Sequence, residues 1–263
     1  MPRRRLDAEL VRRGLVSNRQ EAEEAVRAGR VTVGGMSVAT SATLVDDDVA
    51  LHLGSTGRAF ASRGGEKLSA ALDRFGVDPR DRRCLDAGAS TGGFTDCLLQ
   101  RGAACVVAVD VGYGQLSWSL RNDPRVILLE RTNVRHLGPS DLPFAPELVV
   151  ADLSFISLRV VLPSLAALAS EGAAFIPLVK PQFEASPDDV GKGGVVRDPV
   201  VWRRVLSEVV GTAAEVGLGA IDAMVSPLRG PAGNVEFLLE LRRGVAASVD
   251  LDAVVAEAEG LGP

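Results

Sequence analysis

The spacing of apolar and polar positions changes near residue 60, which predicts two modules. Beyond that point, short apolar runs lie between longer stretches of helical periodicity, such as 158–169 and 200–216. This order is typical of an α/β fold with a doubly wound parallel sheet, and we expect a Rossmann-like domain over 62–263. The expected strands are the run that begins at Cys84 and residues 104–110, 126–133, 147–155, 174–183 and 235–241.

Residues 1–54 have shorter elements and predict a small α+β module. Residues 6–14 have the pattern of a short helix with a glycine stop, and 17–20 have the capping-box spacing that opens a second helix. Residues 31–38 predict two strands joined by a Gly-Gly hairpin turn. We expect 55–61 to link the two modules.

A glycine-rich turn follows the first strand of the second module. Gly88, Gly92 and Gly93 lack the Cβ atoms that would keep a ligand off the backbone, and the chain then enters a helix. The spacing matches neither a dinucleotide fingerprint nor a phosphate loop. Asp86 suits a cationic group such as the amino group of S-adenosylmethionine, and Asp110 can accept both hydroxyls of a ribose. Together these residues predict an adenosyl site.

Two other interpretations of the turn stay open. Residues 88–92 also match the Gly-x-Ser-x-Gly nucleophile elbow of hydrolases. That elbow needs a histidine far downstream, whereas the chain has only His52 and His136, and His136 comes too early. The glycines could also serve only to pack a helix against a strand.

Charged residues stand at the ends of the expected strands. Ligands of doubly wound sheets bind beyond the carboxyl ends of the parallel strands. The residues expected along that edge are Asp86, Asp110, Asp152 and Lys180. Glu236 joins them if the closing strand runs antiparallel to the others. The polar, glycine-containing stretch 184–198 is long for a loop and is a candidate lid.

Composition narrows the classes of protein. With 263 residues and 46% hydrophobic content, the chain can bury one full core and a smaller second one. Its net charge is −5, so any contact with nucleic acid needs a local patch. Residues 1–30 hold eight arginines against five acids, which indicates either a solvated helix face or a phosphate-binding surface.

Cysteines and apolar runs bear on the compartment. The three cysteines lack paired metal spacing, which favours a reduced cytoplasm and no metal site. No apolar run reaches the roughly 18 residues of a membrane span. The 29 basic residues include only three lysines, Lys67, Lys180 and Lys192. A lysine amine, unlike an arginine, can lose its proton, which draws attention to these positions.

Several motifs resemble known families. Residues 5–22 followed by 29–35 resemble the S4 RNA-binding domain. From residue 58 to near the end, the chain resembles the TlyA family, in which an S4 domain precedes an FtsJ-like catalytic domain, and 58–61 match the hinge between them. The motifs are Ser62-Arg-Gly-Gly-Glu-Lys-Leu, Leu85-Asp-Ala-Gly-Ala-Ser-Thr-Gly-Gly-Phe-Thr, Asp110-Val-Gly-Tyr-Gly-Gln-Leu, Ala151-Asp-Leu-Ser-Phe-Ile-Ser and Leu178-Val-Lys-Pro-Gln-Phe-Glu.

This resemblance implies an S-adenosylmethionine-dependent 2'-O-methyltransferase that acts on cytidine in ribosomal RNA. Members of the family differ in whether they modify the large subunit alone or both subunits, and the ends of this chain favour both. The family is also called haemolysin-like, but this sequence contains no membrane-active segment. We expect a cytoplasmic monomer with ribosomal RNA as its partner.

The resemblance also assigns residues. The FtsJ-like group uses a Lys-Asp-Lys-Glu tetrad, which falls here on Lys67, Asp152, Lys180 and Glu236. Because a ribose hydroxyl is a poor nucleophile, we expect Lys180 to act as a base or orienting group, positioned by the two acids. The expected cofactor-binding residues are Asp86, Gly88, Ser90, Gly92, Gly93, Phe94, Asp110, Asn133 and Asp152. The expected RNA-binding residues are Arg3, Arg4, Arg5, Arg12, Arg19, Arg58, Phe60 and Arg63.

Two alternatives to this mechanism are kept. The four tetrad residues could form only a structural salt-bridge network. The chain could also be a non-catalytic, RNA-binding assembly factor of the ribosome that keeps the methyltransferase fold as a scaffold. Such a factor would bind RNA without incorporating methyl groups.

Overall fold

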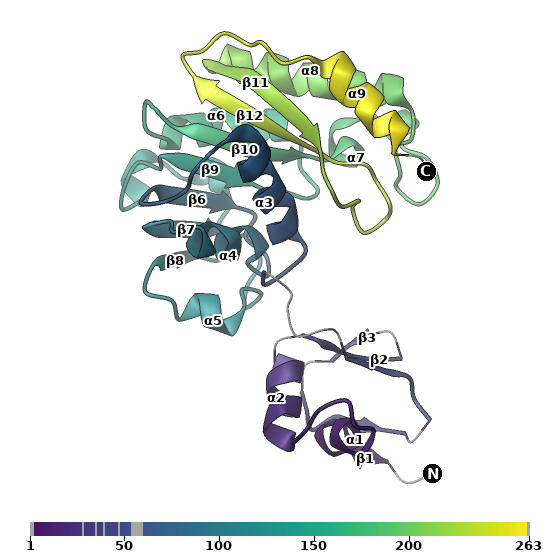
Figure 1. Ribbon diagram of the computed structural model, residues 1–263. Coiled ribbons are helices and arrows are strands. Elements are labelled where there is room, and N and C mark those ends of the chain that lie inside the picture. The colour runs from purple at the N-terminus through teal and green to yellow at the C-terminus, as the bar shows by residue number, and fades with distance from the viewer. Residues whose placement is uncertain are drawn as a thin grey trace. The chain divides into compact units, whose positions relative to one another are not determined.

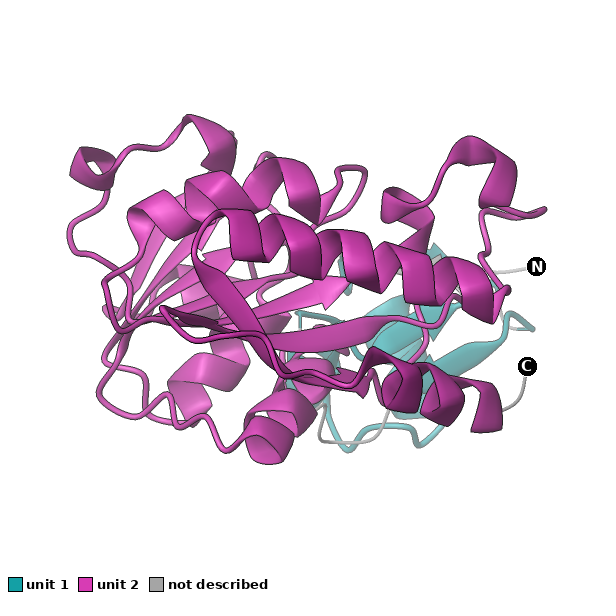
Figure 2. Cartoon of the chain, turned by 90° about the horizontal axis from the view of Figure 1, so that it is seen from above, with its two compact units in different colours: residues 1–58 teal, residues 59–263 magenta. Residues whose placement is uncertain are grey.

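The computed structural model (Figure 1) describes residues 3–27, 29–34, 36–38, 40–46, 48–53 and 60–261. Two compact units divide the chain, residues 1–58 and 59–263 (Figure 2). The linker predicted at 55–61 lies mostly outside the described residues, so its boundaries stay predictions.

Unit 1, residues 1–58, packs two helices and short strands around a small apolar core. Helices α1 (Leu6–Arg12) and α2 (Arg19–Arg27) precede β2 (Val31–Val33), which pairs antiparallel with β3 (Met36–Ser37) and β5 (Leu51–Leu53). Strand β1 (Arg4–Arg5) pairs with β4 (Leu44–Val45). The core includes Leu6, Leu10, Ala22, Val26 and Val31, all buried. The predicted helices and hairpin are therefore present.

The start of α2 differs by one residue from the predicted capping box. Asn18, not Ser17, accepts the cap bond, from the Glu21 backbone N–H at 2.9 Å. The Glu21 carboxylate in turn accepts the Ser17 N–H at 2.7 Å. Asn and Ser cap helices about equally well, so the spacing to the following Gln or Glu could not decide between them.

Unit 2, residues 59–263, is built on a seven-stranded sheet with the order β11-β12-β10-β9-β6-β7-β8 (Figure 1). Five strands are parallel, and β12 runs antiparallel to both of its neighbours. The central strands are apolar and buried on both faces, as parallel strands covered by helices must be. Their bounds are β6 (Arg83–Ala87), β7 (Cys105–Val109), β8 (Val126–Leu129), β9 (Leu148–Ala151), β10 (Ala174–Val179), β11 (Leu218–Val225) and β12 (Phe237–Arg243).

Helices cover both faces of this sheet, which confirms the doubly wound α/β class. One core packs Leu85 and Val107 of the strands against α6 (Leu158–Leu168), α8 (Pro199–Glu215) and α9 (Leu251–Gly260). The other core packs Cys84 and Val106 against α3 (Gly64–Phe75), α4 (Gly93–Gln100) and α5 (Trp118–Arg121). Successive residues of one strand thus face opposite layers.

Two stretches differ from expectation. Strand β11 is missing from the predicted set, because its Gly219, Ala220 and Asp222 weaken a strand pattern. The stretch 184–198 contains a 3₁₀ turn, Pro187–Asp189, and its role as a lid stays a prediction, but part of it is anchored. Val196 is buried, and its N–H donates to the Asn234 side chain at 2.9 Å.

Candidate active site

The carboxyl ends of the parallel strands bring charged residues to one edge of the sheet. Asp110, Asp152 and Lys180 come directly after β7, β9 and β10. Glu236 comes directly before β12, and because β12 is antiparallel to β10, it lies at the same edge. The antiparallel closing strand on which this placement depended is confirmed.

Lys180 and Asp152 form the first of two ion pairs. Lys180 Nζ lies 2.6 Å from Asp152 Oδ1 and donates a hydrogen bond to Ser154 Oγ at 2.9 Å. The two side chains are 12% and 24% exposed, so solvent or a substrate can reach the pair. Ser154 was missed by sequence reasoning, although it lies inside the quoted Asp152 motif.

Lys67 and Glu236 form the second pair, which is buried. Lys67 Nζ donates to Glu236 Oε2 at 2.5 Å, and the side chains are only 9% and 1% exposed. Glycine is required opposite the carboxylate, since a Cβ at Gly230 would lie 2.5 Å from Glu236 Oε1.

Helix α3 brings the two pairs near each other. A Cβ placed on Gly64, at the start of this helix, would lie 3.6 Å from Asp152 Oδ2. Lys67 follows three residues after Gly64, and this distance along the helix axis is less than one turn of about 5.4 Å. Each ion pair thus has one member at the first turn of α3, since Asp152 lies beside Gly64 and Lys67 belongs to the helix itself.

A cleft of about 590 Å³ adjoins the Lys180–Asp152 pair. This volume is in the range of small-molecule sites. Its walls combine polar groups with apolar side chains. The lining residues are Gly88, Ser90, Val109, Asp110, Val111, Gln115, Thr132, Asn133, Val134, Arg135, Asp152, Leu153, Ser154, Phe155, Ile156 and Val161.

Asp110 is held in the cleft wall by backbone groups. Its Oδ2 accepts the Ser90 N–H at 2.8 Å and its Oδ1 accepts the Gly112 N–H at 2.6 Å. Each carboxylate oxygen has two lone pairs, so capacity for ligand hydroxyls is left. Asn133 caps a short 3₁₀ helix, Val134–His136, through the Arg135 N–H at 3.1 Å.

The glycines of the turn are needed for packing inside the protein, whereas the prediction was that they let a ligand approach the backbone. A Cβ on Gly88 would lie 2.5 Å from the Asp152 carbonyl oxygen, at a φ of +88°. On Gly92 it would lie 2.2 Å from a Leu120 methyl group, and on Gly93 2.2 Å from Ser62 Oγ. These glycines thus admit other parts of the protein, and of the three only Gly88 also lines the cleft. These contacts support the packing interpretation of the turn, and the ligand interpretation stays a prediction.

Asp86, predicted to bind the amino group of the cofactor, is fully buried and is not among the residues that line the cleft. Thr95 Oγ1 donates to its Oδ2 at 2.6 Å, while Oδ1 has no hydrogen-bond partner among the described residues. Burial raises the pKa of Asp86 to about 7. Thr95 is a second residue that the sequence did not single out. Phe94, also predicted as a cofactor residue, is buried in the core.

The predicted RNA-binding arginines of unit 1 are exposed and partly paired. Arg3 and Arg5 contact Asp46 and Asp7 at 3.1 and 2.7 Å. The buried Glu9 pairs with Arg12 at 2.5 Å, and the arginine lowers the pKa of this carboxyl to about 2. Arg4 and Arg19 are also exposed. Three of these five arginines thus form ion pairs within unit 1, and all five are exposed.

The remaining predicted RNA-binding residues lie at the start of unit 2. Arg58 is outside the described residues. Phe60 is partly buried and packs on α3, where a Cβ on Gly65 would lie 2.3 Å from its ring carbon Cγ. This contact gives Phe60 a packing role in unit 2, and its predicted contact with RNA stays a prediction. Arg63 is exposed.

The described residues were compared with the requirements of a membrane span and of a metal site. None of the helices they form is both long and apolar enough to cross a membrane. Nor do they contain a group of three or more His, Cys, Asp or Glu side chains placed to hold a metal ion.

Comparisons with known proteins agree with this geometry. Residues 60–243 match the FtsJ-like methyltransferase family and residues 4–49 match the S4 domain. The chain is 55% identical to the 16S/23S rRNA (cytidine-2'-O)-methyltransferase TlyA of Mycobacterium tuberculosis, over 91% of this chain and 90% of the relative. It is 37% identical to Hemolysin A of Brachyspira hyodysenteriae, over 89% and 98%.

A solved structure extends the similarity to the whole fold. The hemolysin-named protein from Streptococcus thermophilus is 38% identical, and the match covers 99% of this chain and 97% of that one with a TM-score of 0.76. With an FtsJ-like match over most of its length and close relatives along nearly all of it, the chain belongs to the FtsJ-like methyltransferases and, among them, to the TlyA family.

Proposed function

We propose that this protein transfers the methyl group of S-adenosylmethionine to the 2'-hydroxyl of a cytidine in ribosomal RNA. The observation that carries the proposal is the Lys180–Asp152 ion pair, whose Asp152 lines a ligand-sized cleft, with the buried Lys67–Glu236 pair at the same edge of the sheet. The TlyA relative named for this reaction supports the choice of cytidine and of the ribose.

The cleft fits an adenosyl group. Asp110 offers carboxylate oxygens to ribose hydroxyls, and Val111, Val134, Leu153 and Ile156 supply apolar walls for a purine. When bound, the cofactor supplies a methyl group on a positively charged sulfur. Asp152, which lines the same cleft and pairs with Lys180, would place the tetrad next to that group.

Lys180 and Asp152 would orient the ribose 2'-hydroxyl, which is the nucleophile, and take up its proton. We infer that Lys180 Nζ would hold the 2'-oxygen in line with the methyl carbon. As the new C–O bond forms, the methyl–sulfur bond would break with its electron pair left on the sulfur, and the hydroxyl proton would pass to the Lys180–Asp152 pair. Proton transfer by a placed side chain contributes about 10²- to 10⁴-fold in rate. Ser154 accepts a hydrogen bond from Lys180 and so limits the positions of the amine.

Lys67 and Glu236 would act behind this pair. Since their charges compensate each other at 2.5 Å, they add no net charge next to the substrate. Their buried pairing instead fixes the first turn of α3, which borders Asp152 through Gly64. We assign Lys67 and Glu236 the role of orienting the other tetrad pair, Lys180 and Asp152, which adjoins the cleft.

Unit 1 would bring ribosomal RNA to the catalytic unit. Its family match and its exposed arginines support binding to phosphate groups. Modification of both subunits is the form that the Mycobacterium relative's name supports. The three cysteines are free thiols, in keeping with work in a reducing cytoplasm.

Substitution of Lys180 tests the proposal. Lys180→Ala is expected to lower methyl incorporation into ribosomal subunits by at least about 10²-fold while cofactor binding, measured by calorimetry, stays near wild type. Lys192→Ala is the matched control, because Lys192 is exposed and takes no part in the site. Full turnover by Lys180→Ala would remove Lys180 from the chemistry, and RNA binding without any methylation by the wild type would favour the assembly-factor alternative.

A further inference from the structure

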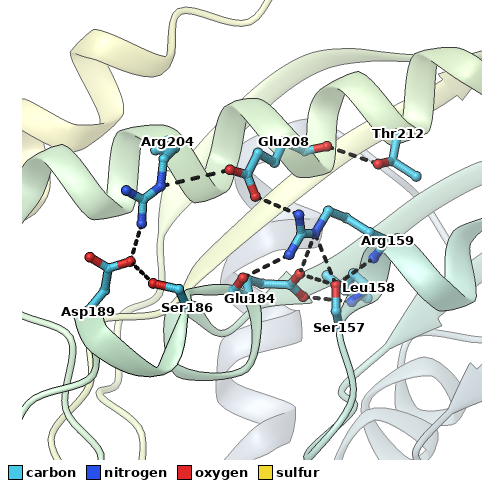
Figure 3. Close-up of polar contacts among 9 residues, drawn as sticks. All are labelled: Ser157, Leu158, Arg159, Glu184, Ser186, Asp189, Arg204, Glu208 and Thr212. Atoms are coloured by element: carbon cyan, nitrogen blue, oxygen red, sulfur yellow. Dashed lines mark hydrogen bonds and ion pairs between the residues drawn. The ribbon is translucent and has the colours of Figure 1, made fainter.

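A buried carboxylate lies four residues after Lys180 and belongs to none of the roles above. Glu184 ends α7 (Pro181–Glu184), the single turn that follows Lys180, and its side chain is 2% exposed. Its Oε2 accepts a hydrogen bond from Ser157 Oγ at 2.5 Å, and its Oε1 accepts the Leu158 N–H at 2.6 Å (Figure 3). Glu184 therefore reaches from the loop after Lys180 to the loop after Asp152.

The two loops leave neighbouring strands and are joined at two levels. Strands β9 and β10 are paired in parallel, so Asp152 and Lys180 emerge side by side. The Lys180–Asp152 ion pair joins the loops where they start. Glu184 joins them again near the entry to α6, and the rings of Phe155 and Phe183 meet between these points with centroids 5.1 Å apart.

The Asp152 loop needs this second connection. Phe155 has a φ of +63°, in the left-handed region that bulky residues avoid, and its side chain is 91% exposed. A strained residue with so little packing keeps its conformation only if the chain on both sides is fixed. Asp152 is fixed by Lys180 on one side, and Glu184 binds Ser157 and Leu158 on the other.

Arg159 attaches this connection to α8. Its Nη2 donates to the Glu184 carbonyl oxygen at 2.9 Å, and its Nη1 contacts Glu208 at 2.6 Å (Figure 3). Arg204, also on α8, pairs with Glu208 and with Asp189. Burial raises the pKa of Glu184, and the donors from Ser157, Leu158 and Arg159 oppose that rise. The carboxylate is thus surrounded by groups that suit its charged form.

We propose that Glu184 is a positioning residue for methyl transfer. It holds the Lys180 loop against the Asp152 loop, so that Lys180 Nζ is aimed at the 2'-oxygen, and it does not itself touch the reacting atoms. This inference rests on the proposed role of Lys180. A misplacement of about 1 Å can cost about 10²-fold in rate, so loosening of the two loops would appear in kcat.

Kinetics give the first test. Glu184→Ala is expected to lower kcat by about 10²-fold and to leave the KM for S-adenosylmethionine nearly unchanged. Glu184→Gln keeps one acceptor oxygen and should recover part of the loss. Glu208→Gln is the matched control, since it removes the charge of a partner of Arg159 on α8 but leaves the contacts of the Glu184 carboxylate with Ser157, Leu158 and Arg159. Unchanged kcat in Glu184→Ala, or an equal loss in Glu208→Gln, would overturn the proposal.

Chemical labelling gives a test that does not depend on activity. The chain has three lysines, so brief acylation followed by mass spectrometry can follow Lys180 against the exposed Lys192. In the wild type the amine of Lys180 is held by Asp152 and Ser154, and we expect its labelling relative to Lys192 to rise several-fold in Glu184→Ala, in proportion to the freed amine. An unchanged ratio overturns the inference whatever the activity.

The two tests separate the two proposals. If the wild type transfers no methyl group, the proposed function is refuted. If the labelling ratio of Lys180 to Lys192 nevertheless rises in Glu184→Ala, the connection between the two loops is still supported. If Glu184→Ala does not fold, Ser157→Ala replaces it, because this variant loses the donor to Oε2 and keeps the Leu158 N–H. It should show the same changes at smaller size, and their absence would count against the proposal.

Discussion

Replacing Glu236 by leucine is expected to destabilise unit 2, because it leaves the charge of Lys67 buried without a partner. The two groups lie 2.5 Å apart, and their side chains are 1% and 9% exposed. Removing one partner of such a pair costs about 3–5 kcal/mol, whereas replacing both by apolar groups of similar volume is often neutral or stabilising. We therefore expect Glu236→Leu alone to lose about 3–5 kcal/mol and Lys67→Met with Glu236→Leu to regain most of it.

Urea unfolding followed by tryptophan fluorescence measures this difference. Both tryptophans, Trp118 and Trp202, lie in unit 2, so the signal reports that unit. Methyl transfer is measured on the same samples, and the double variant is expected to be stable but inactive. A loss below about 1 kcal/mol in Glu236→Leu would refute the burial argument, since that is the range of exposed pairs. Full activity of the stable double variant would refute the orienting role proposed for Lys67 and Glu236.

Three further predictions follow from single sites. Burial raises the pKa of Asp86 to about 7, so its stabilising contribution is present below about pH 4 and is lost as the pH rises through 7. The urea midpoint of the wild type should therefore fall between pH 4 and 8, and Asp86→Asn should remove this pH dependence. An identical pH dependence of the midpoint in both proteins would contradict the prediction. Gly88→Ala should cost about 1–3 kcal/mol, because its Cβ would meet the Asp152 carbonyl oxygen, whereas Gly114→Ala, which also has a positive φ but meets no neighbour, isolates the backbone strain. Asp110→Ala should weaken S-adenosylmethionine binding by about 1.5–3 kcal/mol in calorimetry, and unchanged affinity would exclude the carboxylate from the ribose site.

The sequence was sufficient to predict features that follow a repeating apolar pattern and residues that stand at the ends of strands. Apolar runs buried on both faces predicted β6, β7, β9 and β10, and the rule for strand ends placed Asp110, Asp152 and Lys180 on one edge. The prediction for Lys67 came from resemblance, because nothing in the local pattern of α3 shows that its side chain is buried against Glu236.

Features that depend on tertiary packing were not predictable. Ser154 and Thr95 are short polar residues whose value lies in one long-range bond each, to Lys180 and Asp86. Glu184 ends one of the motifs that carry the family resemblance, but nothing in that motif shows its partners Ser157 and Leu158, which are 27 and 26 residues away. The burial of Asp86 also escaped prediction, since an acid at a strand end is usually solvated.

The central claim concerns the chemistry at one ribose. Purified protein is incubated with isolated ribosomal subunits and methyl-labelled S-adenosylmethionine, and the RNA is digested to nucleosides and separated. The account predicts label in 2'-O-methylcytidine with the wild type and with Lys192→Ala, and its loss with Lys180→Ala. Label on a base, or equal 2'-O-methylcytidine from Lys180→Ala, would contradict it.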